Sequence, residues 1–254
     1  MSVSLGIVMD PIASITVRKD TSFAMLLAAQ ARGWELHYME QGDLWLRDGQ
    51  VLASTRRLRV RDDPGGWYEL AAAQECPLAK LDVVLMRKDP PFDLEFIYST
   101  YLLELAAHAG TLIINKSASL RDANEKAFTA WFPQCCPPTL VTRQRERAKT
   151  FLEEQGDIVV KPMDGMGGQS IFRIREGDPN TNVILETLTA FDTRTMMAQK
   201  FLPEYLEGDK RILLIDGNPV PYALARIPAA GEARANLATG GTGKGVELTA
   251  RDRW

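Results

Sequence analysis

Cysteine and histidine are scarce in this chain of 254 residues, which contains three cysteines and two histidines. Cys135 and Cys136 are adjacent, so the thiols offer neither a disulfide framework nor the spacing of a metal site. His37 and His108 are too few to build a zinc cluster. Packing or surface positions are the expected roles of all these side chains.

Long apolar runs and a strong excess of one charge are also missing. No apolar stretch is long enough to span a bilayer, and residues 1–9 lack the basic start and apolar core of a signal peptide. Lysine and arginine number 30 against 33 aspartates and glutamates, so no global positive field exists to attract nucleic acid or an anionic membrane. The sequence predicts a cytoplasmic protein that binds neither nucleic acid nor membrane. Any anion-binding site must be formed locally by a few side chains and not by the overall charge.

The chain does have the material for a core, because 45% of its residues are hydrophobic. In the first half, strands are expected at 5–9, 34–39, 81–86 and 111–115, with helices over 23–30 and 94–109 between them. These strand-helix-strand units predict a parallel sheet with helices on its faces. Residues 43–75 suit a hairpin and an irregular excursion.

The second half has a different, α+β pattern. Helices are expected near 124–132 and 144–155, and strands at 158–161, 170–175, 195–199, 211–216 and 220–226. Asp216, Gly217 and Asn218 predict a tight turn between the last two strands. There is no internal repeat and no low-complexity tract.

A glycine-rich loop lies between two apolar strands in the segment IVVKPMDGMGGQSIFRI (158–174). Gly165, Gly167 and Gly168 let backbone N–H groups approach an anion without side-chain obstruction. The segment is not a P-loop, because no lysine directly precedes a serine or threonine and no helix follows. The glycines alone leave an ordinary hairpin turn and a phosphate flap equally open. Lys161 favours the flap, because a cation at its base would lie beside the phosphates.

Other basic residues need separate interpretation. Lys126 is expected opposite the apolar stripe of its helix, where solvent exposure is the default. Arg211 and Arg226 fall on the two strands joined by the turn, so they could together neutralise a transferring phosphoryl group, or be surface arginines. The loop at 227–245, with Arg234, Asn236 and several glycines, is either a disordered linker or an active-site lid, and we favour the lid.

With these residues assembled, the chain resembles the bacterial glutathione synthetases of the ATP-grasp superfamily over its whole length. The matching stretches, in the family's order, are GIVMDPI (6–12), LMRKDPPFD (85–93), SLRDANEK (119–126), KPMDGMGG (161–168), MAQKFLP (197–203), GDKRILLIDG (208–217) and GEARANLATGG (231–241). A series of blocks in the same order is far more specific than any one of them.

The resemblance implies an α/β fold in which an ATP-grasp fold follows a parallel α/β, pre-ATP-grasp, N-terminal domain. The expected divisions are a substrate-side domain at 1–121, an ATP-grasp lobe with the flap at 122–201, and the start of the C-terminal lobe with the lid at 202–254. In the family, later strands carry the acidic residues and asparagine that bind magnesium. No such set is visible beyond Arg226, so the chain is expected to be truncated, with its metal ligands beyond Trp254 and none assigned within it.

The implied activity is that of a C–N ligase using ATP and Mg²⁺. ATP would phosphorylate the cysteinyl carboxylate of γ-glutamylcysteine, and the amine of glycine would attack the acyl phosphate to give glutathione, ADP and phosphate. The family's tetrameric habit implies a homo-oligomer. Two alternatives remain, another ATP-grasp ligase with a different acyl substrate and a nucleotide-binding module without catalysis.

The resemblance also assigns roles to residues. It places Lys126 and Lys161 on the phosphates, the hinge at 199–202 beside adenine, and Asp209 near the ribose or phosphate end. The whole ATP-binding set is Lys126, Lys161, Asp164, Gly165, Gly167, Gly168, Gln169, Ser170, Gln199, Lys200, Phe201, Leu202 and Asp209.

The reaction builds up negative charge, which needs cations around it. The expected catalytic set is Arg211, Arg226 and Arg234, with Asn236 beside them in the lid. Arg87 and Lys88 follow a parallel strand and could hold the substrate's carboxylates, and Asp89 completes the expected substrate-binding set. The alternative for them is a solvated turn before the two prolines that follow.

Overall fold

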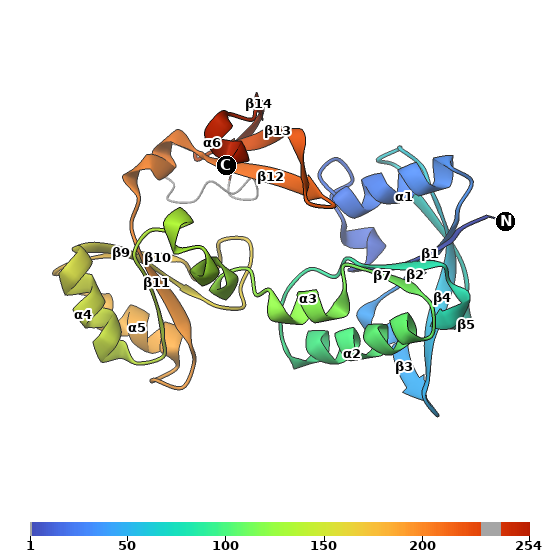
Figure 1. Cartoon of the computed structure of the whole chain (residues 1–254), viewed down its shortest axis with the longest axis horizontal. Coiled ribbons are helices and arrows are strands. Elements are labelled where there is room, and N and C mark those ends of the chain that lie inside the picture. Colours follow the sequence, from blue (N-terminus) through green and yellow to red (C-terminus); the bar gives the residue numbers. More distant parts are fainter. Residues whose placement is uncertain (1, 230–239) are drawn as a thin grey trace. The chain divides into compact units, whose positions relative to one another are not determined.

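The computed structural model describes residues 2–229 and 240–254. The chain divides into two compact units, Met1–Asn124 and Glu125–Trp254, each with its own core (Figure 1). Among the described helices, none is long and apolar enough to cross a membrane.

Unit 1 contains one sheet with helices on both faces. Its strands are β1 (Ser4–Val8), β2 (Glu35–Met39), β3 (Leu44–Arg47), β4 (Gln50–Val60), β5 (Tyr68–Pro77), β6 (Val83–Met86) and β7 (Leu112–Ile114), and its α-helices are α1 (Thr21–Ala31), α2 (Leu94–His108) and α3 (Ser117–Asp122). The strand order is β3-β4-β2-β1-β6-β7, with β5 paired to β4. Because β2, β1, β6 and β7 are parallel, the predicted strand-helix-strand units are confirmed.

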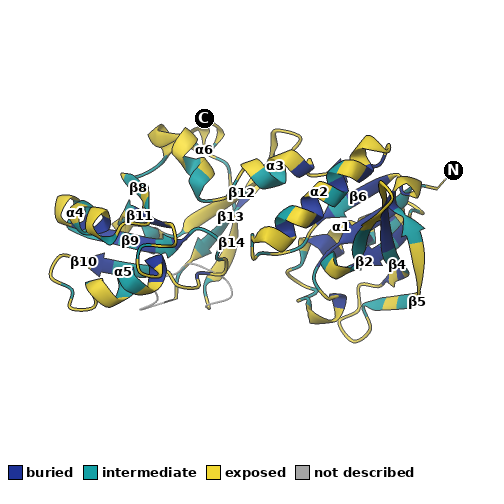
Figure 2. Cartoon of the chain, turned by 90° about the horizontal axis from the view of Figure 1, so that it is seen from below, coloured by how far each residue is buried: buried dark blue, intermediate teal, exposed yellow. Residues whose placement is uncertain are grey.

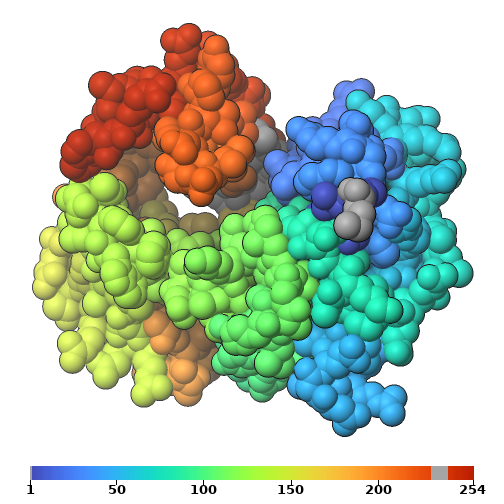
Figure 3. All heavy atoms as spheres, turned by 45° about the vertical axis from the view of Figure 1, so that its right-hand side comes forward, coloured from blue at the N-terminus to red at the C-terminus, as the bar shows by residue number. Residues whose placement is uncertain are grey.

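Alternate residues of β1 face two different cores. Leu5 and Ile7 belong to the cluster that includes Phe23 of α1, whereas Val8 belongs to the cluster that includes Phe96 of α2. Successive side chains of a strand point to opposite faces, so β1 is a central strand covered on both sides. Figure 2 shows dark blue stretches on β2, β4 and β6 and yellow on β5, and in Figure 3 the blue-to-teal atoms of this unit are packed against one another.

The prediction of an irregular excursion within 43–75 is wrong, whereas the predicted hairpin at Asp48 and Gly49 is confirmed. Strands β4 and β5 are 11 and 10 residues long and pair with each other antiparallel. Strand β5 reads YELAAAQECP and is mostly exposed, so it lacks the apolar alternation from which a strand is predicted. Its backbone ladder with β4, and not a buried face, defines it.

The described residues of unit 2 form two antiparallel sheets. The first has the order β10-β9-β11-β8, built from β8 (Thr139–Thr142), β9 (Asp157–Pro162), β10 (Phe172–Arg175) and β11 (Met196–Lys200), with helices α4 (Arg145–Gln155) and α5 (Thr181–Thr189). The second consists of β12 (Asp209–Ile215), β13 (Asn218–Ile227) and β14 (Thr242–Glu247), followed by α6 (Ala250–Arg253). The five predicted strands and the helix near 144–155 are confirmed, whereas β8, α5 and β14 had not been predicted.

The helix expected near 124–132 is instead a 3-10 helix over Ala127–Trp131, and helix α3 lies before it. Pro133 follows closely, and a proline disfavours the helical conformation of the residue before it. Phe132 accordingly has φ −127° and ψ 60°. Lys126 therefore precedes a tight turn and does not lie within a helix.

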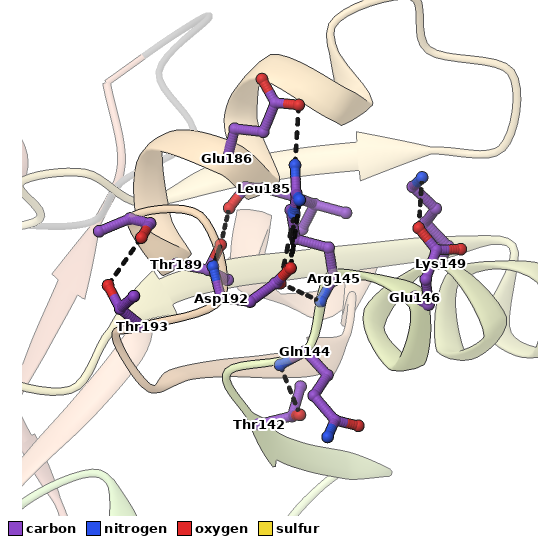
Figure 4. Close-up of polar contacts among 11 residues, drawn as sticks. Thr142, Gln144, Arg145, Glu146, Lys149, Leu185, Glu186, Thr189, Asp192 and Thr193 are labelled. Atoms are coloured by element: carbon purple, nitrogen blue, oxygen red, sulfur yellow. Dashed lines mark hydrogen bonds and ion pairs between the residues drawn. The ribbon is translucent and has the colours of Figure 1, made fainter.

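Helices α4 and α5 are connected through Arg145 (Figure 4). Its guanidinium donates to Glu186 over 2.8 Å and to Asp192 over 3.1 Å, and its backbone N–H donates to Asp192 over 2.8 Å. Ala190, Phe191 and Asp192 have φ of 45°, 55° and 68°, in the left-handed region that non-glycine residues avoid. The contacts of Arg145 hold this unfavourable turn in place.

Candidate active site

Lys161 lies on the face of the first unit 2 sheet that is opposite the helices. Along β9, Ile158 and Val160 are fully buried in the core with α4 and α5, so the intervening residues point the other way. Lys161 pairs with Met197 of β11. Gln199 stands two residues further along β11, on the same face as Lys161.

The ammonium group of Lys161 donates to Oε1 of Gln199 over 2.7 Å. Burial lowers the pKa of Lys161 below its ordinary value, and the nearby positive charge of Lys126 lowers the pKa further. Both effects disfavour the charged lysine until an anion arrives. A phosphate bound here would offset them, so the site suits an anionic ligand.

Lys126 is not solvent-exposed, so the default expectation for it is wrong. Only 12% of its side chain is exposed. Its ammonium group donates to the backbone carbonyl of Gly165 over 2.6 Å and to Glu125 over 2.7 Å. The 3-10 turn that replaces the expected helix directs this side chain toward the loop, which brings a second cation near Lys161.

The glycine-rich loop joins β9 and β10, which pair antiparallel as the flap interpretation requires. Gly167 and Gly168 have φ of 66° and 81°, and Ser170 has φ of 55°. Glycine adopts this left-handed conformation at little cost. A Cβ at Gly165 would lie 3.2 Å from Cγ of Pro162, so the loop is also tight at its base.

The first carboxylate of the loop is paired within unit 2. Nη2 of Arg194 donates to both oxygens of Asp164, over 2.8 and 2.7 Å. The N–H of Gln169 donates to the carbonyl of Met166 over 3.2 Å, which forms the turn at the tip. Asp164 therefore anchors the loop to the segment after α5.

Residues 199–202, the expected hinge, lie at the end of β11. The N–H of Lys200 donates to the carbonyl of Pro138 over 3.0 Å, and the N–H of Phe201 donates to the carbonyl of Asp157 over 2.9 Å. The ring of Phe201 lies 3.5 Å below the guanidinium of Arg173. Leu202 is 49% exposed. The backbone here is fixed by hydrogen bonds and its last side chain remains accessible.

Arg211 and Arg226 lie on the predicted pair of strands, β12 and β13. Asp209 pairs with Arg226 and Arg211 pairs with Leu224, so all three charged residues share one face, with Arg211 diagonal to Arg226. The guanidinium of Arg226 donates to the two oxygens of Asp209 over 2.7 and 2.6 Å. The structure thus places these three residues together on β12 and β13. Arg234 and Asn236 lie outside the described residues.

In unit 1, Arg87, Lys88 and Asp89 follow the carboxyl end of β6. Strand β1 continues through α1 to β2 on one side, and β6 continues through α2 to β7 on the other. The adjacent strands β1 and β6 therefore mark the point where the strand order reverses. Ligands of open α/β sheets bind outside the carboxyl ends of strands at such a point.

Asp10, which the sequence analysis had not singled out, joins this group from the end of β1. Its carboxylate pairs with Lys88 over 2.7 Å and accepts from the N–H of Asp89 over 2.8 Å. Burial and the charge of Asp10 raise the pKa of Asp89. The guanidinium of Arg87 donates to Ser22 over 3.0 Å. Cations and carboxylates thus alternate at the edge of the sheet.

Models of two domains match almost the whole chain. The N-terminal domain of prokaryotic glutathione synthetase matches residues 3–121, and the ATP-grasp domain of the same family matches residues 125–254. The chain belongs to the prokaryotic glutathione synthetase family. The resemblance stated from the sequence and the ATP-grasp fold it implied are both confirmed.

Individual relatives agree with the family. The glutathione synthetase of Yersinia pestis is 61% identical over 250 residues, which cover 98% of this chain and 78% of the relative. The glutathione synthetase of Pseudomonas putida is 61% identical over 254 residues, which cover 100% of this chain and 80% of the relative. A solved structure of the ATP-grasp ligase PsnB with minimal precursor, Mg and ADP matches with a TM-score of 0.55 and 17% identity, over 98% of this chain and 78% of that one. At that identity the match shows the fold alone.

Proposed function

We propose that this chain is an ATP-dependent ligase that joins γ-glutamylcysteine to glycine. The observation that carries the proposal is the convergence of Lys126 and Lys161 at a glycine-rich flap, in a member of the prokaryotic glutathione synthetase family. The γ-phosphoryl group of ATP passes to the cysteinyl carboxylate, and ADP leaves. The amine of glycine then attacks the acyl phosphate, phosphate leaves, and the amine loses a proton.

Lys161 and Lys126 hold the phosphates of ATP in this reaction. Two ammonium groups that repel each other gain most when a polyanion binds beside them, because the ligand removes that repulsion. Backbone N–H groups of Gly165, Gly167 and Gly168, with Gln169 and Ser170, cover the phosphates, and Asp164 anchors that cover to Arg194. Adenine lies along the hinge at 199–202, with Gln199, Lys200, Phe201 and Leu202 around it.

The arginines offset the charge that develops as the acyl phosphate and the tetrahedral species form. Arg211 and Arg226 share a face of β12 and β13, where Asp209 holds the guanidinium of Arg226 in one orientation. A fixed cation costs no reorganisation at the moment of reaction. Arg234 and Asn236 act from the lid, which excludes the water that would hydrolyse the acyl phosphate.

The substrate's charged groups bind at the carboxyl ends of β1 and β6. Arg87 and Lys88 take carboxylates, and Asp89 with Asp10 takes the ammonium group of an amino-acid end. Alternation of cations and carboxylates matches a zwitterion better than a simple anion. The cytoplasm is the proposed compartment, because ATP is supplied there and the thiol substrate stays reduced.

ATP and Mg²⁺ are the cofactors of this reaction. Within residues 2–229 and 240–254, no group of three or more His, Cys, Asp or Glu side chains could hold a metal ion. No step through the ion is therefore assigned to the described residues.

A homo-oligomer, a tetramer by the family resemblance, is also proposed. Helix α2 exposes Leu94, Tyr98, Tyr101 and Leu105 at 63, 52, 49 and 40%, and its yellow surface faces the viewer in Figure 2. Their spacing of four, three and four is symmetric, so an antiparallel second copy would pair Leu94 with Leu105 and Tyr98 with Tyr101 about a twofold axis. Light scattering should show Tyr98→Glu dissociating, while Tyr222→Glu, at an exposed tyrosine of β13, leaves the assembly intact.

The decisive experiment supplies ATP, Mg²⁺, γ-glutamylcysteine and glycine, and follows ADP release together with glutathione by mass spectrometry. Both products should form, and Lys161→Ala should abolish both. Lys149→Ala, a lysine of α4 that pairs with Glu146, is the matched control and should retain activity. Turnover with other acid and amine pairs alone would point to another ATP-grasp ligase. ATP binding without ADP release would point to a nucleotide-binding module.

A further inference from the structure

Three hydrogen bonds run in series from the phosphate-binding lysine across the sheet. Lys161 donates to Oε1 of Gln199 over 2.7 Å, and Nε2 of Gln199 donates to Oγ1 of Thr139 over 2.9 Å. The hydroxyl of Thr139 donates to the carbonyl of Pro137 over 2.7 Å. The series crosses strands β9, β11 and β8, which are neighbours in the sheet.

The direction of each bond follows from the last one. A hydroxyl has a single proton, and Thr139 gives it to Pro137, so toward Gln199 the hydroxyl accepts. The amide of Gln199 must therefore turn its NH₂ group to Thr139 and its oxygen to Lys161. A flipped amide would place NH₂ against the ammonium group, with no acceptor for either. The hydrogen-bond network thus decides an orientation that the shape of the amide leaves open.

Strand register supports this arrangement. Thr139 pairs directly with Gln199 across β8 and β11, so the two side chains share a face. Gln199 is in turn diagonal to Lys161 across β11 and β9. One contact therefore joins a directly opposed pair, and the other joins a diagonal pair on the same face of the sheet.

We propose that Thr139 is a positioning residue that fixes the amide of Gln199, and through it the ammonium group of Lys161. The proposal rests on the role of Lys161 in ATP binding given above. Thr139 itself touches neither ATP nor the reacting atoms. Loss of its hydroxyl frees the amide to rotate, so Lys161 loses a fixed acceptor oxygen and its charged form is held less well.

The first test measures the protonation of Lys161 without ATP. Labelling of Lys161 by an amine-reactive reagent is followed against pH by peptide mass spectrometry in wild type, Thr139→Val and Thr139→Ser. Valine keeps the shape of threonine and loses the hydroxyl, whereas serine keeps the hydroxyl. The labelling midpoint should move to lower pH in Thr139→Val and stay in place in Thr139→Ser. An unchanged midpoint in Thr139→Val overturns the proposal.

A second background tests whether Thr139 acts through Gln199. In Gln199→Leu the acceptor oxygen is already gone, so adding Thr139→Val should move the midpoint no further. A further shift of the same size as in wild type would mean that Thr139 acts by another route, and would also overturn the proposal.

Kinetics then separate this proposal from the proposed function. Thr139→Val should raise KM for ATP about tenfold with little change in kcat, and Thr139→Ser should stay within about twofold. Equal KM increases in both variants would contradict the role of the hydroxyl. If Lys161→Ala leaves the dissociation constant of ATP unchanged, the ATP-binding role of Lys161 fails, while the labelling experiment still decides whether Thr139 positions it.

Discussion

Arg194 and Asp164 form a two-point contact in which one nitrogen of the guanidinium donates to both carboxylate oxygens, over 2.8 and 2.7 Å. Both side chains are substantially exposed, at 53 and 39%, so water screens much of the attraction. The contact still links the flap to the segment after α5, and its loss should free the flap before it destabilises the fold.

We therefore expect Arg194→Gln to raise KM for ATP about two- to fivefold, in line with the loss of at most about 1 kcal/mol. Limited proteolysis should cut the flap faster in this variant. Arg175→Gln is the matched control, because Arg175 lies on the neighbouring strand β10 and contacts Asp157 only at 3.4 Å. Equal proteolysis of wild type and Arg194→Gln would show that the pair does not restrain the flap.

The lowered pKa of Lys161 predicts how ATP binding depends on pH. Its ammonium form is disfavoured first by burial and then by Lys126, so it loses its proton on the acid side of the ordinary value of 10.5. The part of the ATP affinity that needs this charge is complete at low pH and disappears as the pH rises through the lowered pKa. The free energy of unfolding without ATP depends on pH in the opposite way. It increases with pH between the lowered pKa and 10.5, because the unfolded chain binds the proton more tightly.

Titration of the ATP dissociation constant against pH would check this. Lys126→Met removes one of the two causes of the lowered pKa of Lys161. The midpoint of the pH dependence of ATP binding should therefore move to higher pH, even though the affinity at neutral pH falls. A midpoint that stays in place in this variant would mean that the charge of Lys126 does not reach Lys161.

The left-handed turn after α5 leads us to expect that an alanine-to-glycine exchange changes the free energy of unfolding in opposite directions at two positions. Ala190 has φ 45°, so Ala190→Gly should relieve strain and raise the free energy of unfolding by about 1 kcal/mol. The same exchange at Ala107, an exposed position of α2, should lower it by about 1 kcal/mol. Urea denaturation measures both. Destabilisation by Ala190→Gly would mean that the turn is not strained at that residue.

The turn also depends on its partner. Asp192→Ala removes the carboxylate that accepts from the backbone and guanidinium of Arg145, and we expect it to lower the free energy of unfolding. Asp178→Ala offers a comparison, since Asp178 accepts from the backbone of Asn180 within a single exposed turn and should cost less.

Much of the phosphate site could be predicted because its signals are local. An alternating apolar strand carrying Lys161, followed by glycines and another strand, already predicts a flap with a cation at its base. The positions of Arg211 and Arg226 on one hairpin likewise follow from the turn between their strands. The comparisons confirm the family and fold, whereas the roles of individual residues stay predictions.

What could not be predicted depends on pairings between distant parts of the chain. Lys126 reaches Gly165 only because a 3-10 turn replaces the expected helix, which the sequence pattern did not reveal. The contact between Lys161 and Gln199 depends on the antiparallel register of β9 and β11. The sequence does contain a signal for Asp10, because this residue follows one parallel strand as Arg87 follows another. Only the order of the strands in the sheet shows that the two residues are neighbours.

Arg234 supplies the last prediction, which rests on the family's lid. If this guanidinium stabilises the anion formed when glycine attacks, its contribution is made in the transition state and not in the ATP complex. Arg234→Ala should then lower the rate of glutathione formation by about 100-fold or more while the ATP dissociation constant changes little. Lys244→Ala, at an exposed lysine of β14, is the control for loss of positive charge and should affect neither quantity.

Equal loss of ATP binding and glutathione formation in Arg234→Ala would contradict the lid role and place the residue in the nucleotide site. Only a group that contacts the bound nucleotide changes both quantities to the same extent.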